Sequence, residues 1–183
     1  MAPSTLSFCI VIRSYLHNKI VYTMEGKRME SQTIFAFLSS FALAFVAYII
    51  PKKMKPYEIY TTSIFATLFG LLVDTVLAVK YKLYVLDRPG IQIPPLIGQV
   101  VLYFSTSIIL LNLYPYDKPI KWKAGYILGF TFCTLVFEFI SYKAGFIKYH
   151  EWKIWYSALS YPFLICFLVL HYHFFQWLVK RSL

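Results

Sequence analysis

The amino-acid sequence predicts an all-α protein, an integral membrane bundle of five transmembrane helices joined by short loops. Of its 183 residues, 59% are hydrophobic and only 14% are charged, whereas a soluble domain carries roughly 25% charged residues. The apolar residues fall into blocks close to the about 20 residues that cross a bilayer core. Lys or Arg flanks each block, with Tyr and Trp near the ends, as interfacial anchoring requires. The five predicted spans cover residues 33–50, 59–79, 96–113, 124–140 and 154–178.

Short loops separate these spans and hold the basic residues. The first two spans are divided by "PKKMKPYE" and the next two by "KYKLYVLDRPGIQIPP". Prolines disfavour helical backbone at the preceding residue, so Pro94 and Pro95 set the start of the third span. The loop "YPYDKPIKWK" leads into the fourth span, and the aromatic run "KYHEWKIWYSALSYP" forms the interfacial belt that anchors the fifth.

Composition excludes several classes of function. The net charge of +10 is explained by basic residues that meet anionic lipid headgroups, and no Lys/Arg block is dense enough to indicate nucleic-acid binding. Cys9, Cys133 and Cys166 have no paired spacing, so neither a disulfide framework nor a zinc site is predicted. The chain has no Gly-rich phosphate loop and no pattern of a catalytic triad. We therefore predict no cofactor and no metal.

Residues 1–28 form a doubtful N-terminal extension ahead of the transmembrane domain, 29–183. The apolar stretch "SFCIVI" is followed at once by Arg13, which makes it too short for a signal peptide or a membrane crossing. In a bacterial source, the codons for Met24 to Gly26 can contain a ribosome-binding sequence. The hypothesis is that translation starts at Met29.

Two carboxylates interrupt the apolar spans. A charge near the bilayer centre costs about 2.5–3.5 kcal/mol on insertion scales, so such residues usually face a bundle interior or a wet cavity. At 100° per residue, polar or small residues share the helix face of Asp74, and a similar set shares that of Glu138. The resulting binding seam comprises Tyr60, Ser63, Thr67, Gly70, Asp74 and Tyr81 with Thr131, Thr134, Glu138, Ser141 and Tyr142.

The two acids are expected to lie at matching depth. Their helices run in the same direction, and each acid precedes a terminal lysine, Lys80 or Lys143, by a few residues. At 1.5 Å per residue, both lie within roughly 10 Å of the same membrane face. Gln99 shares a helix face with Tyr103, and Ser157, Ser160 and Tyr161 lie on one side of the fifth span, where they extend the seam. Gly125 and Gly129 form a small-residue patch suited to close helix packing.

Four segments together resemble a known group of proteins. They are "FGLLVDTVLAVKYKLY", "LNLYP", the helix with Glu138, and "GFIKYHEWKIWYSALSYP". This combination resembles a family of small uncharacterised multi-pass membrane proteins of Bacillus-like and clostridial Firmicutes, over about Ile59 to Leu178. The resemblance implies a multi-pass protein of the bacterial cytoplasmic membrane, and it implies no activity.

Three functions remain open. The leading interpretation is a membrane protein, not an enzyme, whose polar seam packs the helices and binds a small lipid or cation. The alternative is a membrane-embedded cyclase or transferase acting on a prenyl-type lipid, with Asp74 and Glu138 as acid groups. The third is a proton-coupled carrier, which five helices support only as a homo-oligomer. The expected partners are the lipid bilayer and a small lipid ligand, and nucleic acid is not among them.

Overall fold

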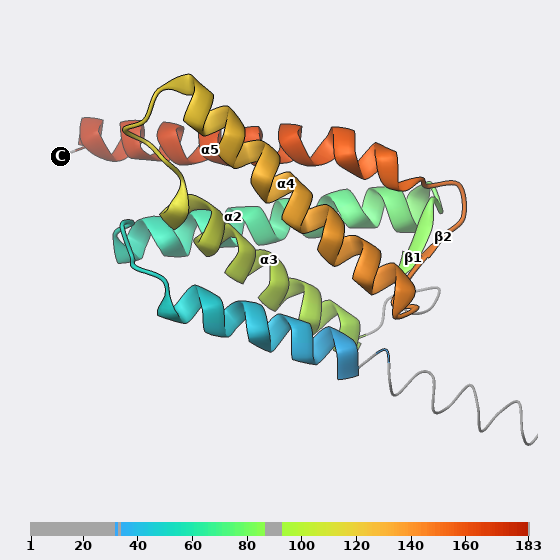
Figure 1. Cartoon of the computed structure of the whole chain (residues 1–183). Helices are drawn as coiled ribbons and strands as arrows, with labels where there is room; N and C mark the ends of the chain where they lie inside the picture. Colours follow the sequence, from blue (N-terminus) through green and yellow to red (C-terminus); the bar gives the residue numbers. More distant parts are fainter. Residues whose placement is uncertain (1–31, 33, 87–92, 183) are drawn as a thin grey trace, which may run out of the picture.

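A computed structural model describes residues 32, 34–86 and 93–182 of the chain. The predicted extension, residues 1–28, and the hypothetical start at Met29 lie outside the described residues. Figure 1 shows the elements in chain order. They are a first helix Ile34–Ile49, α2 Pro56–Asp74, the π-helical segment η1 Thr75–Lys80, β1 Tyr84–Leu86, α3 Ile93–Leu113, α4 Ile120–Lys143, β2 Ile147–Tyr149 and α5 Ile154–Ser182.

The all-α prediction is confirmed, although two three-residue strands that the sequence did not reveal join the helix ends. Four helices are long and apolar enough to cross a membrane: α2 with η1, α3 from Leu96, α4 and α5. The first helix, Ile34–Ile49, is apolar but shorter. The described residues are thus compatible with a multi-pass membrane protein.

The helices after the first one extend beyond the predicted spans because apolar content marks the hydrocarbon core and not the helix end. The α4 helix begins at Ile120, after Pro119 at the N-cap, and continues to Lys143. The α2 helix begins at Pro56, where the missing proline N–H belongs to a position without an intrahelical partner. In both helices the polar residues that flank the apolar block continue the helical hydrogen bonding, so the helix ends beyond the block.

The helices that carry the two acids both end in a distorted turn. After Asp74 the backbone widens into η1, and the Thr75 hydroxyl donates a 2.7 Å hydrogen bond to the Leu71 carbonyl. The α4 helix ends in a Schellman motif, with Phe146 N–H donating to the Ser141 carbonyl at 3.0 Å and Gly145 at φ 78°. Each turn directs the chain into a strand.

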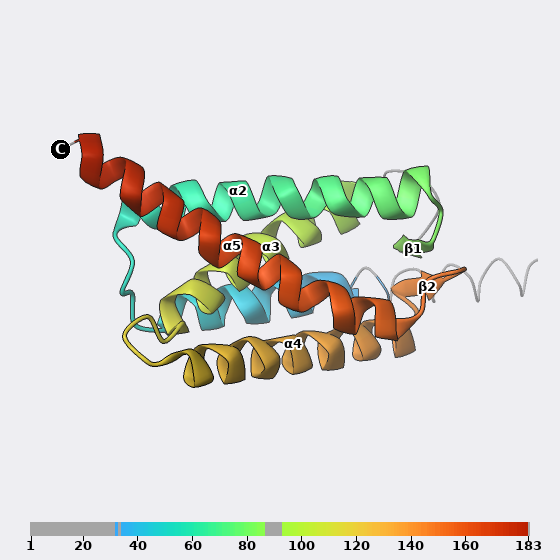
Figure 2. The same cartoon turned by 90° about the horizontal axis from the view of Figure 1, so that it is seen from above.

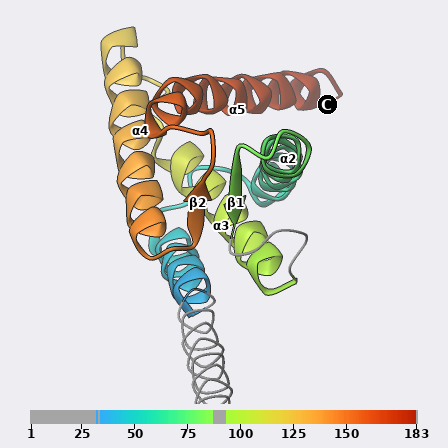
Figure 3. The same ribbon diagram turned by 90° about the vertical axis from the view of Figure 1, so that its right-hand side faces the viewer.

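The α2 and α4 helices run in the same direction, and the first helix, α3 and α5 run in the opposite one (Figure 1). The α2 helix packs on α3, while α5 crosses obliquely and packs on both α4 and α2 (Figure 2). The first helix lies against α3, where the Ser40 hydroxyl donates to the Gly98 carbonyl at 2.9 Å. The antiparallel strands lie across one end of the bundle, between α2 and α4 (Figure 3).

The hydrophobic core lies toward the end of the bundle away from the strands. Buried side chains from the loop before α2, from α3 and the residue after it, and from α5 form this core, and partly buried aromatic and aliphatic residues surround it. The side chain of Asn112 is fully buried there and accepts hydrogen bonds from the backbone N–H groups of Lys53 and Met54 at 2.7 and 3.1 Å. The core consists of Met54, Leu110, Leu111, Tyr114, Ile165, Val169 and Tyr172.

Candidate ligand-binding cavity

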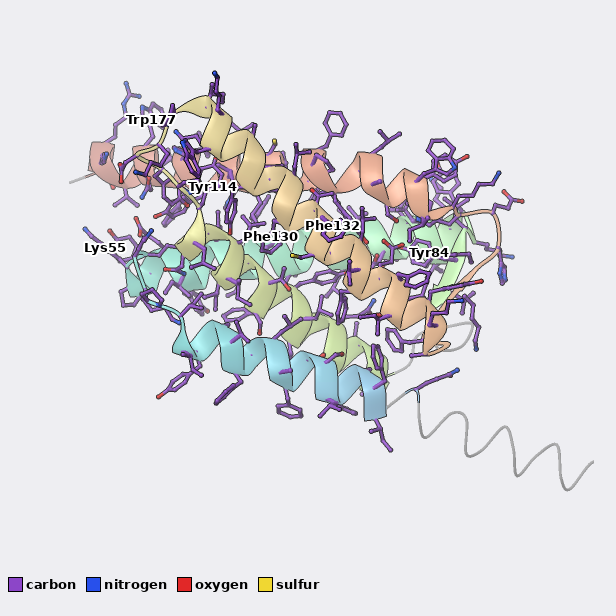
Figure 4. The ribbon with its side chains drawn as sticks, in the orientation of Figure 1. Lys55, Tyr84, Tyr114, Phe130, Phe132 and Trp177 are labelled. Atoms are coloured by element: carbon purple, nitrogen blue, oxygen red, sulfur yellow. The ribbon has the colours of Figure 1, made fainter. Side chains whose placement is uncertain are left out.

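A cavity of about 1110 Å³ lies inside the bundle. It extends along α3 from Gly98 to Leu113, a rise of about 22 Å, and side chains from all five helices and both strands line it. Phe130 lines the cavity whereas Phe132, two residues along α4, is 66% exposed on the outside (Figure 4). The aromatic part of the lining away from the two acids comprises Phe35, Phe65, Phe69, Tyr126, Phe130, Phe137, Phe146, Phe163 and Phe167.

Asp74 lies on this cavity and accepts three hydrogen bonds from two other elements. The Tyr84 hydroxyl, on β1, donates to Oδ1 at 2.6 Å. Gln99 Nε2, on α3, donates to Oδ2 at 3.0 Å. The Tyr103 hydroxyl, one turn further along α3, also donates to Oδ2. The carboxylate is thereby fixed in orientation by groups that are themselves held on rigid elements.

Glu138 has a corresponding set of three donors on β2 and α5. The hydroxyls of Tyr149 and Ser157 donate to Oε1 at 2.5 and 2.7 Å, and the Tyr161 hydroxyl donates to Oε2 at 2.6 Å. The indole Nε1 of Trp152 donates to the Ser157 oxygen at 2.8 Å, which orients that hydroxyl toward the acid. Glu138 is only 6% exposed.

The strand pair connects the two acid sites. Tyr84 on β1 stands directly opposite Tyr149 on β2, so the phenols that bind Asp74 and Glu138 are neighbours across the ribbon. Burial raises the pKa of Tyr84, and the nearby Asp74 raises it further. Burial and the hydrogen bond to Glu138 raise the pKa of Tyr149. Both phenols therefore stay protonated and act as donors at neutral pH.

The loop after β2 is held to the start of β1 through one carbonyl. The Leu83 oxygen accepts from the backbone N–H groups of His150, Glu151 and Trp152 at 3.0, 3.1 and 3.0 Å. These contacts place the Trp152 ring edge-on to Tyr84, with centroids 5.8 Å apart. Aromatic side chains thus line the strand end of the cavity beside both carboxylates.

The structure brings part of the predicted seam to the cavity. Gly70, Asp74, Thr134, Glu138 and Ser141 line it. The other predicted residues do not: Ser63, Thr67 and Thr131 are buried in the packing, and Tyr60, Tyr81 and Tyr142 are 66%, 58% and 42% exposed. Tyr60, Ser63, Tyr81 and Tyr142 lie beyond the lining residues of their helices. Thr67 and Thr131 lie within that length but are buried on another side of the helix.

Several partners of the acids lie on faces that the sequence analysis had noted. Gln99 and Tyr103 from α3 reach Asp74, and Ser157 and Tyr161 from α5 reach Glu138. The strand tyrosines were missed because they follow the helix ends, where helical periodicity no longer applies. A tyrosine shortly after the terminal lysine of each acid-bearing helix, in "KYKLY" and "KAGFIKY", is the signal they left.

The glycines of the bundle have different surroundings from those expected. A Cβ added at Gly70 would lie 3.0 Å from the Tyr103 ring, so the bare backbone is what lets that ring reach Asp74. The expected close packing at Gly125 and Gly129 is wrong within this chain, because a Cβ at either would meet nothing within 4 Å. Gly129 faces the cavity instead.

Comparisons of the chain with protein-family models, curated proteins and solved structures find no match. The resemblance to the Firmicutes family stays a prediction. The candidate site therefore rests on the cavity and its two carboxylates.

Proposed function

We propose that the protein is a multi-pass protein of the bacterial cytoplasmic membrane that binds a small lipid in the cavity between its helices. The observation that carries the proposal is the combination of a cavity of about 1110 Å³, aromatic along its length, with two oriented carboxylates at one end. Apolar pockets with a few placed polar groups are the usual form of small-molecule sites. The elongated apolar part accommodates a hydrocarbon chain, and the acid end accommodates a head group.

Two cysteines provide a direct test. Cys133 is exposed and lines the cavity, while Cys166 is exposed but does not line it. In purified full-length protein carrying Cys9→Ser, the rate of maleimide modification is measured at each site by mass spectrometry. A lipid bound in the cavity slows the reaction at Cys133 and leaves Cys166 unchanged.

A matched pair of glycine variants tests the same proposal from the protein side. Gly129→Phe places a ring in the cavity, and Gly125→Phe places the same ring on the same helix outside it. Native mass spectrometry is expected to detect less retained lipid with Gly129→Phe than with Gly125→Phe. Equal lipid retention in both variants, together with unprotected Cys133, would overturn the proposal.

A second candidate is a cyclase or transferase acting on a prenyl-type lipid. It is favoured by the carboxyl groups beside aromatic faces, which stabilise cations. It ranks second because acid catalysis requires the acid to donate a proton, whereas in this arrangement neighbouring protein groups donate to Asp74 and Glu138. Incubation with polyprenyl lipids, followed by mass spectrometry, decides the matter. A cyclised or transferred product that Glu138→Gln abolishes would establish the enzyme, and unchanged substrate would exclude it.

A further inference from the structure

We infer that the head group of the bound lipid is a positively charged amine, held between Asp74 and Glu138. The inference rests on the proposed lipid-binding function and names the class of ligand. Its first support is charge. Among the described residues that line the cavity there are two carboxylates but no Lys, Arg or His. Buried charges in proteins are normally paired because desolvation is costly, and a cationic ligand supplies the missing charge.

The hydrogen bonds leave room for such a ligand. A carboxylate has about four lone-pair positions. Oδ2 of Asp74 accepts two bonds and Oδ1 one. Oε1 of Glu138 likewise accepts two and Oε2 one. Each acid therefore retains one acceptor position that no described residue fills, and an ammonium group has only donors to offer.

The side chains around the acids also favour a cation. Tyr84, Tyr103, Tyr149, Trp152 and Tyr161 all line the cavity beside the two carboxylates. The faces of tyrosine and tryptophan rings attract ammonium groups, most strongly where water is excluded. Aromatic rings combined with carboxylates form a head-group site that suits an amine better than a hydroxyl and repels a phosphate or sulfate.

In a membrane, the head group of the ligand determines which lipid the cavity selects. Lipid tails are as apolar as the cavity wall, so moving a hydrocarbon chain from the bilayer into the cavity gains little from the hydrophobic effect. Discrimination among membrane lipids must then come from the polar end. The donors that orient the acids lie on α3, α5 and the strand pair, so the site is already organised before binding.

The test compares three probes with the same chain: octadecylamine, octadecanol and octadecyl sulfate. Protection of Cys133 from maleimide is measured in the wild-type chain, with Cys166 as the internal reference. The amine is expected to protect at a concentration about tenfold lower than the alcohol, which is equivalent to about 1.4 kcal/mol, and the sulfate to protect least. Asp74→Asn combined with Glu138→Gln should remove the preference for the amine while the alcohol still protects.

The outcomes separate the claim of a cationic head group from the claim of a lipid-binding cavity. Equal protection by amine and alcohol in the wild-type chain would overturn the cationic head group and leave the lipid cavity standing. No protection by any probe, together with equal lipid retention in Gly129→Phe and Gly125→Phe, would overturn both. Because the order of the three probes is measured on the wild-type chain, the inference stays testable even if the double variant does not fold. Glu58→Gln, outside the cavity lining, serves as the matched charge-neutralising control and should keep the preference.

Discussion

The two ends of the bundle both bury a carboxylate against α5, yet only the acid at the strand end lies on the cavity wall. At the strand end, Ser157 and Tyr161 of α5 bind Glu138 beside the cavity. At the opposite end, Tyr172 and Gln176 of the same helix bind Glu58, both at 3.2 Å. In Figure 4, Lys55 and Trp177 lie at the end away from the strands, and Tyr84 lies at the strand end.

Glu58 has the hydrogen-bonding pattern of a structural residue. It lies in the first turn of α2, where Oε2 accepts from the backbone N–H of the N-cap residue Lys55 at 2.8 Å. It is 7% exposed and outside the cavity lining. Glu138 is equally buried. The comparison teaches that burial and hydrogen bonding alone do not identify a ligand site, because the adjoining open volume is what distinguishes the two acids.

The largest expected effect is a loss of stability from a substitution at Glu58. Glu58→Ala removes the acceptor of the Lys55 backbone N–H and of the Tyr172 and Gln176 side chains, and the buried Tyr172 hydroxyl is left without it. Together these losses should lower the free energy of unfolding by about 3 kcal/mol, measured by denaturant titration in detergent micelles. Glu151→Ala, which removes an exposed acid, is the control and should change stability little. A Glu58→Ala protein as stable as the control would contradict the structural role.

A smaller effect is expected where single phenol hydroxyls are removed at the strand end of the bundle. Tyr149→Phe and Tyr84→Phe each keep the ring and delete one donor to an acid, so each should cost about 1 kcal/mol. They should also weaken the preference for the amine probe, because the carboxylates lose their orientation. Tyr142→Phe keeps the ring stacked 4.9 Å from Tyr149 and should leave binding unchanged. If all three variants bind alike, the strand tyrosines do not organise the site.

The glycines sharpen the comparison within the cavity itself. Gly70→Ala forces the Tyr103 ring to move, since the added Cβ would lie at 3.0 Å, and should destabilise by up to about 1 kcal/mol. Gly129→Ala meets open space and should stabilise α4 by about 0.5–1 kcal/mol, because alanine favours the helix. Thermal unfolding of the two variants side by side measures the difference in sign.

The smallest effect is a pH dependence at the alkaline end. The folded-state pKa values of Tyr84 and Tyr149 are raised above the ordinary value of 10.0. A raised pKa contributes stability that is complete below about pH 10 and is lost as pH rises above it. Unfolding midpoints should therefore be flat from neutral pH to about pH 10 and then fall.

Substitution separates the contributions of the two ends to this pH dependence. Burial also raises the pKa of Tyr116, at the end of the bundle away from the strands. Replacing Tyr84 and Tyr149 together by phenylalanine should flatten the fall in part, and Tyr116→Phe should remove a further share without changing amine binding. A fall that the double variant leaves unchanged would contradict the assignment to the strand tyrosines.

Helix periodicity predicted many of the residues that form the site, but it did not predict how they are placed relative to one another. It selected Asp74 and Glu138 as the polar interruptions of two co-directed helices, and it noted the faces of Gln99 with Tyr103 and of Ser157 with Tyr161. It did not place those faces against the acids, because periodicity orders residues within one helix and is silent on how that helix is rotated against its neighbours. It also extended the seam to Tyr60 and Tyr142, which the packing leaves exposed.

The sequence by itself determined the apolar blocks and their termini, because block length and the identities of proline, glycine and lysine act locally along the chain. Only the tertiary structure decided that Tyr84 pairs with Tyr149 and that the volume between the helices is a cavity with both acids on its wall. Those features depend on contacts between residues far apart in sequence. No local pattern encodes them, since they arise from how whole helices pack.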